Sequence, residues 1–274
     1  MNSVERLRYF GVELEEKAPL HTIDVRESWP EKGEIVFNDV AIRYRKNLPL
    51  VLQGLSLHNK GGERIGVVGR TSAGKSLITD ALFRPVEISA GSITIDGVNI
   101  SRIGLLGLRS RTIRSNLDPF HEHTDLALWS ALRKTGLIRA GADDTKLEDR
   151  KDDTAPALLM ALARALVRDT RIVICDEATS SVDMETDDKI QLAMVSGFRG
   201  KTLLCIAHRL RTIIGYDRIC VVDAGQIAQF DTPANLYCEE GGIFRGMCER
   251  SSIRLEDIES ARDTITTFDD TNRR

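Results

Sequence analysis

The sequence predicts an α/β protein in which helices cover both faces of a mostly parallel β-sheet. Short apolar runs typical of buried strands alternate with segments that favour helices along much of the chain. The stretch GRTSAGKS, Gly69–Ser76, directly follows the apolar run Ile65–Val68, and a later apolar run ends in Asp176 and Glu177. Because parallel strands need long crossover connections, which are usually helices, this alternation indicates a parallel sheet.

The individual elements are predicted from their periodicity. Alternating or continuous apolar residues predict strands at 34–44, around 56, at 63–68, 92–97, 171–178 and 201–208, and in the run RICVVDAG. Helical patterns lie at 75–83, near 126–134, at 158–167 and at 184–197, with two short helices near the C-terminus. We expect the helix at 75–83 to begin at the glycine-rich loop.

Three regions of different character divide the chain. Residues 1–32 are polar and acidic, contain Pro19 and Pro30, and are predicted to be a lead-in or linker. Residues 33–249 are predicted to form the folded domain. Residues 250–274 are rich in Asp, Glu, Thr and Arg, and are predicted to be a mobile polar tail.

The composition argues against nucleic-acid binding, a disulfide framework and a membrane-spanning segment. The net charge of −3 over 274 residues gives no clustered basic excess, so we expect no nucleic-acid partner. The five cysteines are odd in number and form no C-x-x-C pair, which favours reduced core thiols over disulfides or a metal site. The N-terminus lacks an apolar signal core, and no run of about 18 apolar residues predicts a membrane span.

The stretch GRTSAGKS fits the phosphate-loop pattern G-x-x-x-x-G-K-[ST]. Glycines allow successive backbone N–H groups to turn toward an anion, and the following helix adds its positive N-terminal end. Lys75 can then reach the outer phosphates of a nucleotide, and the Ser76 hydroxyl can ligate Mg²⁺. The alternative is a glycine-rich turn with an exposed lysine, which the strand before it and the helix after it disfavour.

A buried strand that ends in Asp176 places a carboxylate at the edge of the sheet where α/β proteins bind ligands. Asp176 would hold Mg²⁺, directly or through water, and Glu177 would orient or deprotonate an attacking water. Two solvated acids at a strand end are the alternative. Two further candidates stay open from the residues alone: His208 ends a strand, where a histidine is usually structural, and Tyr44 is an aromatic that packs more often than it stacks on adenine.

Together these pieces resemble the nucleotide-binding domain of an ATP-binding cassette (ABC) transporter. The resemblance extends from about residue 1 to 251. The sequence is similar to the C subfamily, the multidrug-resistance type, and in particular to the second nucleotide-binding domain of fungal oligomycin-resistance-like exporters. The segments that carry it are GRTSAGKS, ICDEATSSVD (174–183), CIAHRLRTII (205–214), EIVFNDVAIRYRKNLPLVLQGLSL (34–57), GSITIDGVNISRIGL (91–105) and TIRSNLDPF (112–120).

The resemblance implies a P-loop ATPase fold with an antiparallel β subdomain and a helical subdomain. It implies that Tyr44 stacks on adenine, that Glu177 is the catalytic base and that His208 senses the γ-phosphate. Residues 181–183 would contact a second nucleotide-binding domain in a head-to-tail dimer, and residues 1–32 would derive from a linker to membrane domains. The cofactors implied are ATP and Mg²⁺. The nucleotide and metal contacts would come from Gly69, Arg70, Thr71, Ser72, Ala73, Gly74, Lys75, Ser76 and Leu77, with Ser76 and Asp176 holding the metal.

The sequence departs from the family pattern at three places. Residues 108–111 join Thr112 directly, so the stretch that holds the family's glutamine loop is absent, and residues 151–157 stand where an LSGGQ-type signature is expected. The helical subdomain is therefore expected to be shortened. In the phosphate loop, Ser72 replaces a glycine, which costs about 1 kcal/mol or more if φ is positive there, and Leu77 replaces a second hydroxyl.

The resemblance thus leads us to expect an ATP-binding domain of a drug or organic-anion exporter, without its membrane domains and with weak or no hydrolysis when isolated. It would act at the cytoplasmic face of a membrane, or lie in the cytoplasm if made alone, against an intact partner domain and the membrane domains of a transporter. The alternative is a non-catalytic nucleotide-binding or interaction module. A soluble ABC ATPase of translation or DNA repair is disfavoured, because those carry two cassettes or long insertions.

Overall fold

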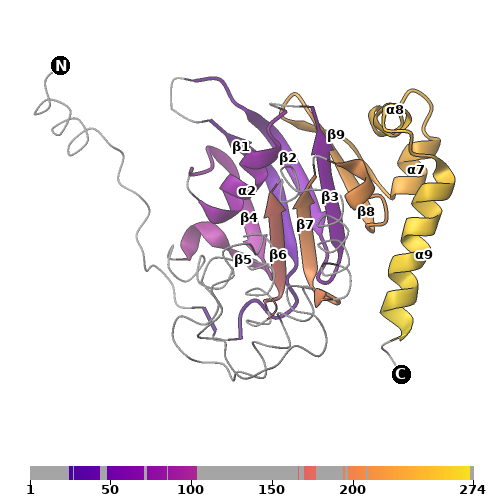
Figure 1. Cartoon of the computed structure of the whole chain (residues 1–274). Helices are drawn as coiled ribbons and strands as arrows, with labels where there is room; N and C mark the ends of the chain where they lie inside the picture. The colour runs from indigo at the N-terminus through magenta and orange to yellow at the C-terminus, as the bar shows by residue number, and fades with distance from the viewer. Residues whose placement is uncertain are drawn as a thin grey trace, which may run out of the picture.

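The structure of the protein is a computed structural model. It describes residues 25–26, 28–43, 48–70, 73–84, 86–103, 166, 170–176, 194, 197–207 and 209–271, with side chains as far as 267. Two sheets, one helix that follows the glycine-rich loop and a group of C-terminal helices make up most of the described part (Figure 1).

The smaller sheet is antiparallel, with strand order β2-β1-β4-β5. Its strands are β1 (Ile35–Ile42), β2 (Leu52–Asn59), β4 (Ala90–Ile95) and β5 (Val98–Asn99). Alternating residues of β1 and β2 are buried, as expected for strands with one face on a core. Asp96 and Gly97 both have positive φ, 48° and 75°, which is the type I′ turn that joins β4 to β5.

The larger sheet has strand order β6-β7-β3-β8-β9. Its members are β3 (Arg64–Gly69), β6 (Ile172–Asp176), β7 (Thr202–Ile206), β8 (Arg218–Asp223) and β9 (Gln226–Asp231). All its neighbouring strands are parallel except β8 and β9, which pair antiparallel at one edge. The predicted α/β class, with a mostly parallel sheet and an antiparallel β subdomain, is therefore confirmed.

Two hydrophobic cores lie on opposite faces of the parallel sheet. The first packs the sheet against the antiparallel sheet and helix α2 (Lys75–Phe83). The second packs the other face against α7 (Pro233–Cys238), α8 (Ile243–Arg250) and α9 (Leu255–Thr271), which stand together beyond β8 and β9 in Figure 1. Residues alternate between the two cores along β7, where Leu204 belongs to the first and Leu203 to the second.

Most predicted elements are found at their predicted places. The helix predicted at 75–83 is α2 with the same bounds. The strands predicted at 171–178 and 201–208 contain β6 and β7, and the strand predicted at 63–68 is β3, shifted by one residue. The two short C-terminal helices are α7 and α8. The helices predicted near 126–134, at 158–167 and at 184–197 lie wholly or almost wholly outside the described residues.

The prediction of a mobile polar tail at 250–274 was wrong for Leu255–Thr271, which form α9. The helix buries Ile258, which is 2% exposed, and packs Ala261 and Ile265 against the second core. These three residues are spaced by three and four, which is the period of a helix face. The composition of the segment, averaged over all residues, concealed this narrow apolar stripe.

The buried Arg84 ends helix α2 and ties it to the segment after β5. Arg84 has φ 53° at the C-cap, and its side chain donates from Nη1 to the carbonyl oxygens of Ile100 and Ile103 at 2.9 and 2.8 Å. Its Nη2 also contacts Glu87 Oε1 at 2.8 Å. Ile100 opens the short 3₁₀ helix η1 (Ile100–Arg102). One guanidinium thus holds the end of α2 and the chain that leads to residue 103.

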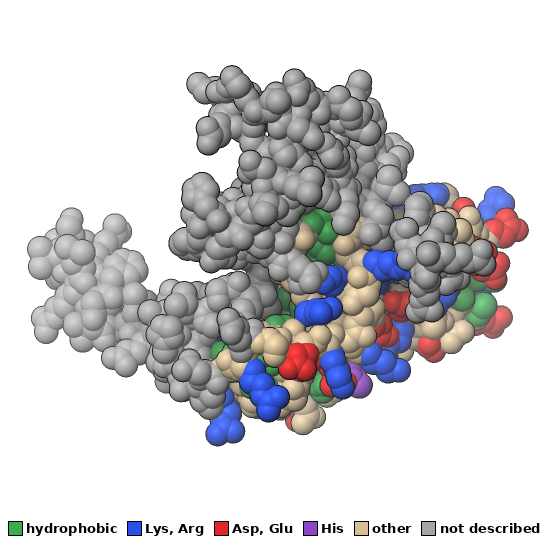
Figure 2. Space-filling view, turned by 90° about the horizontal axis from the view of Figure 1, so that it is seen from below, with side chains coloured by type: hydrophobic (Ala, Val, Ile, Leu, Met, Phe, Trp, Pro, Cys, Tyr) green, Lys and Arg blue, Asp and Glu red, His purple; other side chains and the backbone are tan. Residues whose placement is uncertain are grey.

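The surface of the described part is mixed in charge. On the face in Figure 2, Lys and Arg side chains are interspersed with Asp and Glu. Leu48, 47% exposed, is the one large hydrophobic side chain that is highly exposed among the described residues. No helix in that part of the chain combines the length and apolar content that crossing a bilayer demands.

The Asp96 carboxylate organises the chain where it enters β1. It accepts hydrogen bonds from four successive backbone N–H groups, those of residues 31–34, at 2.7 to 3.2 Å. Partial burial of Asp96 acts to raise its pKa, but these four hydrogen bonds outweigh it and lower the pKa below the ordinary value.

Replacing Asp96 with Asn is expected to lower the free energy of unfolding by about 1 kcal/mol at neutral pH, since an amide offers one uncharged acceptor oxygen and solvent screens part of the effect. Because the folded-state pKa is depressed, this contribution is present above the unfolded value near 3.8 and is lost as the pH falls below it. Urea unfolding of wild type and Asp96→Asn at about pH 7 and pH 3 checks this.

The difference between the two proteins should shrink at the lower pH. Asp263→Asn, a substitution on the exposed side of α9, is the control and should change stability at neither pH. An equal difference at both pH values would show that the hydrogen-bonded carboxylate is not its source.

Candidate functional site

The glycine-rich loop lies between the end of β3 and the start of α2. Gly69 is the last residue of β3, and a Cβ there would lie 2.2 Å from the carbonyl oxygen of Val222 on the neighbouring β8. Gly74 precedes α2 with φ 97°, in the left-handed region that favours glycine. Both glycines are therefore required by the backbone, one by close approach and one by conformation.

Lys75 is the first residue of α2, and its ammonium folds back over the loop. Its Nζ donates to the carbonyl oxygens of Gly69 and Arg70 at 3.0 and 2.9 Å. The N-terminus of α2 has no side-chain cap and no acidic residue in its first turn. The loop therefore combines a lysine charge with the positive end of a nine-residue helix, which suits an anion such as a phosphate.

The turn between β8 and β9 supports this loop from behind. Gly225 donates its N–H to the carbonyl of Ala73 at 3.1 Å, and its own carbonyl accepts the N–H of Gln53, at the start of β2, at 3.0 Å. Ala224 and Gly225 have φ 47° and 78°, so this turn too is of the type I′ kind. Through one residue the loop is thus connected to the antiparallel sheet.

The Asp176 carboxylate ends β6, two strands away from β3. Its Oδ2 accepts a hydrogen bond from Thr79 Oγ1 at 3.1 Å, and the same hydroxyl lies 2.6 Å from the carbonyl oxygen of Ser76. Thr79 is 5% exposed, and Ser76 is exposed on the first turn of α2. The structure therefore connects the helix that carries Ser76 to Asp176 by a buried threonine.

The residues at this edge fit a bound Mg²⁺. Ser76 supplies a hydroxyl oxygen and Asp176 a carboxylate oxygen, and hard oxygen donors of this kind are the ligands that Mg²⁺ prefers. Within the described ranges, no three His, Cys, Asp or Glu side chains gather into a metal-binding group. A magnesium ion here would depend on these two residues and on phosphate oxygens, which is how proteins usually hold it.

Sequence reasoning missed two residues that shape the site. Gly225 could have been suspected from the two-residue turn between the strands β8 and β9. Thr79 carried no local signal, because a threonine within a helix is ordinary until its partner on β6 is known. Leu77, predicted as part of the loop, is 2% exposed and its side chain belongs to the first core.

Five of the predicted site residues lie outside the described residues: Tyr44, Thr71, Ser72, Glu177 and His208. The same holds for residues 181–183 and for the two places where family segments are absent from the sequence. The roles expected of all of these remain predictions.

The five cysteines are free thiols that lie mostly in the core. Four of the five are buried, as predicted for core thiols, and Cys238 is exposed. Cys175 and Cys205 face each other across β6 and β7, where the hydrogen bond between them and then burial hold the pKa of Cys175 well above its ordinary value. Burial also raises the pKa of Cys220 to about 12.

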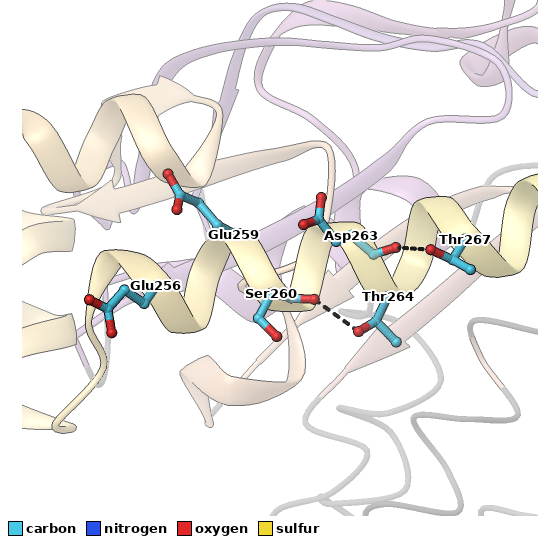
Figure 3. A pocket seen from close by; sticks show the side chains of 6 residues that line it. All are labelled: Glu256, Glu259, Ser260, Asp263, Thr264 and Thr267. Atoms are coloured by element: carbon cyan, nitrogen blue, oxygen red, sulfur yellow. Dashed lines mark hydrogen bonds between the residues drawn. The ribbon is translucent and has the colours of Figure 1, made fainter.

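A hollow runs along α9, away from the glycine-rich loop, and all the side chains that line it come from that helix (Figure 3). The hydroxyls of Thr264 and Thr267 bond back to the carbonyls of Ser260 and Asp263, each at 2.8 Å. The charged members are carboxylates, those of Glu256, Glu259 and Asp263. A surface of negative charge repels a nucleotide triphosphate, so this hollow does not suit the same ligand.

Comparisons with known proteins agree with this geometry. Residues 52–180 match the family model described as "ABC transporter". The chain is 56% identical to the ABC-type transporter cicA of Emericella nidulans, 45% identical to the oligomycin resistance ATP-dependent permease YOR1 of Saccharomyces cerevisiae, and 42% identical to the human ATP-binding cassette sub-family C member 3. These alignments cover 94%, 95% and 92% of this chain but 21%, 20% and 18% of the relatives.

The chain thus spans about a fifth of the length of the curated relatives it matches. The alignment with cicA runs over 295 residues, more than the 274 of this chain, so the relative has residues with no counterpart here. Among solved structures, a bacterial Atm1-family ABC exporter with ATP bound matches with a TM-score of 0.71 at 24% identity, over 91% of this chain and 47% of that one. This structural likeness supports the fold.

Replacing Gly225 with Ala should lower the free energy of unfolding by about 3 kcal/mol, because the added Cβ would lie 2.0 Å from the carbonyl oxygen of Val51 as well as at a positive φ. Gly241→Ala is the matched control, since Gly241 has φ 73° but open space around a Cβ, and about 1 kcal/mol is expected there. Urea unfolding of both variants measures the difference. Equal losses would mean that the close approach of Gly225 to Val51 adds nothing to the cost of a side chain at a positive φ.

Proposed function

We propose that this chain, a member of the ABC transporter family, is a nucleotide-binding domain that takes ATP with Mg²⁺ at the loop between β3 and α2 and belongs to an export system. The observation that carries the proposal is the union of the loop of Gly69 and Gly74, the Lys75 ammonium and the Asp176 carboxylate at one edge of the parallel sheet. The family match supports the nucleotide class, because it covers residues 52–180 and so includes all of these groups.

The binding step follows from the chain's own groups. The phosphates would lie against the backbone of residues 69–76 and the N-terminus of α2, where the helix end and Lys75 supply positive charge. On the family likeness, Tyr44 would stack on the adenine ring. Ser76 and Asp176 would hold Mg²⁺, which, when bound, neutralises phosphate charge and polarises the bond to be broken.

Hydrolysis would use residues that follow two neighbouring strands, β6 and β7. Glu177, next to Asp176 at the end of β6, would orient and deprotonate the attacking water, and His208, two residues after β7, would contact the terminal phosphate. Since β6 and β7 are adjacent and parallel, both residues continue the chain from the same edge of the sheet. These two roles come from the family likeness.

We propose that the isolated chain hydrolyses ATP weakly or not at all. The sequence lacks a glutamine loop and an LSGGQ-type signature, and the aligned relative is longer than this chain over the shared region. In the family, two domains pair head to tail and each ATP lies between the loop of one and the signature of the other. Against an intact first domain, the loop and acids of this chain could complete one hybrid site.

The cargo class is inferred from relatives that are named as an oligomycin resistance permease and a multidrug resistance protein. We propose drug or organic-anion efflux at the cytoplasmic face of a membrane, with membrane domains supplied outside this stretch of sequence. A non-catalytic module that binds nucleotide and docks on a transporter is the second candidate, favoured by the absent signature.

Calorimetric titration with ATP and Mg²⁺ tests the binding proposal. Lys75→Ala should weaken ATP binding by about tenfold to a hundredfold, because one charge-assisted contact to phosphate is lost. Lys60→Ala, at the exposed turn before β3, should leave binding unchanged. A wild-type protein that is folded by circular dichroism but binds no ATP would contradict the proposal.

Mixing the chain with an intact first nucleotide-binding domain tests the catalytic half. We expect negligible steady-state ATP hydrolysis from the chain alone, and hydrolysis in the mixture that Glu177→Gln abolishes. Failure of the mixture to hydrolyse ATP faster than the first domain alone, at every ratio, would favour the non-catalytic module. Robust hydrolysis by the isolated chain, lost in Glu177→Gln, would contradict the expected impairment.

A further inference from the structure

Thr79 is buried in the middle of α2 and makes a contact that its helix does not require. A threonine in a helix commonly bonds a carbonyl three or four residues back, and the 2.6 Å contact with Ser76 O is of this kind. The second contact, 3.1 Å to Asp176 Oδ2, reaches a residue 97 positions further along the chain, on a different element. Its hydroxyl has one proton, and the carboxylate is the stronger of the two acceptors.

The position of Thr79 places this contact between the two candidate metal ligands, Ser76 and Asp176. It lies three residues after Ser76, so both project from neighbouring turns of the same side of α2. Its partner Asp176 is the last residue of β6. One hydroxyl therefore touches the backbone of one candidate metal ligand and the side chain of the other, and it sets how the helix and the strand end face each other.

We propose that Thr79 is a positioning residue that holds the Asp176 carboxylate for Mg²⁺ at the nucleotide site. The proposal rests on the proposed function, because it concerns the metal that accompanies ATP. Groups that hydrogen-bond a metal ligand fix its orientation, and their loss typically weakens metal affinity or activity by about 10- to 100-fold. Thr79 has this relation to Asp176 without being a candidate ligand itself.

The test measures ATP affinity by calorimetry in Mg²⁺ and in EDTA, and takes the ratio of the two affinities for each protein. Thr79→Val, which keeps the shape but removes the hydroxyl, should reduce the Mg²⁺-dependent gain about tenfold or more, and leave affinity in EDTA near that of wild type. Thr79→Ser, which keeps the hydroxyl, should retain the gain. A purely structural role would lower both affinities together.

Thr212→Val is the matched control. Thr212 Oγ1 also bonds a carbonyl three residues back, that of Arg209 at 2.7 Å, in the short helix η2 (Leu210–Thr212), and its hydroxyl makes no hydrogen bond to a carboxylate among the residues that the structure describes. Its substitution should leave the Mg²⁺-dependent gain unchanged. If Thr79→Val proves unfolded by circular dichroism, Thr79→Cys replaces it, since cysteine is unbranched like serine but its thiol is only a weak donor.

A double-mutant cycle separates action through Asp176 from action elsewhere. Asp176→Asn should itself reduce the Mg²⁺-dependent gain, and adding Thr79→Val to it should reduce the gain no further. Additive losses would overturn the proposal, as would a Thr79→Val protein whose gain equals that of wild type.

The outcomes also distinguish this inference from the function on which it rests. Wild-type protein that binds ATP equally in Mg²⁺ and in EDTA would overturn the role of Thr79 and leave nucleotide binding intact. Wild-type protein that binds ATP in neither condition would overturn the proposed function, and the inference with it.

Discussion

The close backbone approach between the end of β3 and the β8–β9 hairpin is the constraint on which the candidate site depends. The α-carbon of Gly69 meets the carbonyl of Val222 so tightly that no side chain fits. Three residues after Val222, Gly225 joins the loop to β2 of the antiparallel sheet. The loop is thereby fixed against rigid strands at both ends. A loop that must present backbone N–H groups to an anion loses little entropy on binding when its frame is already set.

The topology of the parallel sheet likewise places the parts of the site before any side-chain contact is made. Parallel strands bring their carboxyl ends to one edge, so β3, β6 and β7 deliver the loop, the acid and the segment before His208 to neighbouring places. The two cores on opposite faces hold this order. Side-chain contacts such as that of Thr79 then adjust an arrangement that the topology has already made.

Features that depend on residues close together in the sequence could be predicted from it, whereas contacts between distant segments could not. Helix α2 was placed with its observed bounds, because a loop motif and a helical apolar pattern meet within ten residues. The edge position of Asp176 followed from a single apolar run. The pairing of Ala73 with Gly225, and of Thr79 with Asp176, joins segments about a hundred residues or more apart, and no local pattern encodes it. Helix α9 was missed for a different reason: Ile258, Ala261 and Ile265 are few among charged neighbours, and only their spacing, not their number, indicates a helix.

The hydrogen bonds of Arg84 to the segment after β5 bear on how such a chain can change over evolution. By occupying the carbonyls of Ile100 and Ile103, its guanidinium satisfies the backbone shortly before the place where the family resemblance leads us to expect a missing segment. A border whose polar groups are already paired tolerates insertion or excision beyond it, since no buried group is orphaned by the change. The end of α2 and the segment after β5 are thus held by contacts of their own, independently of the chain that follows residue 103.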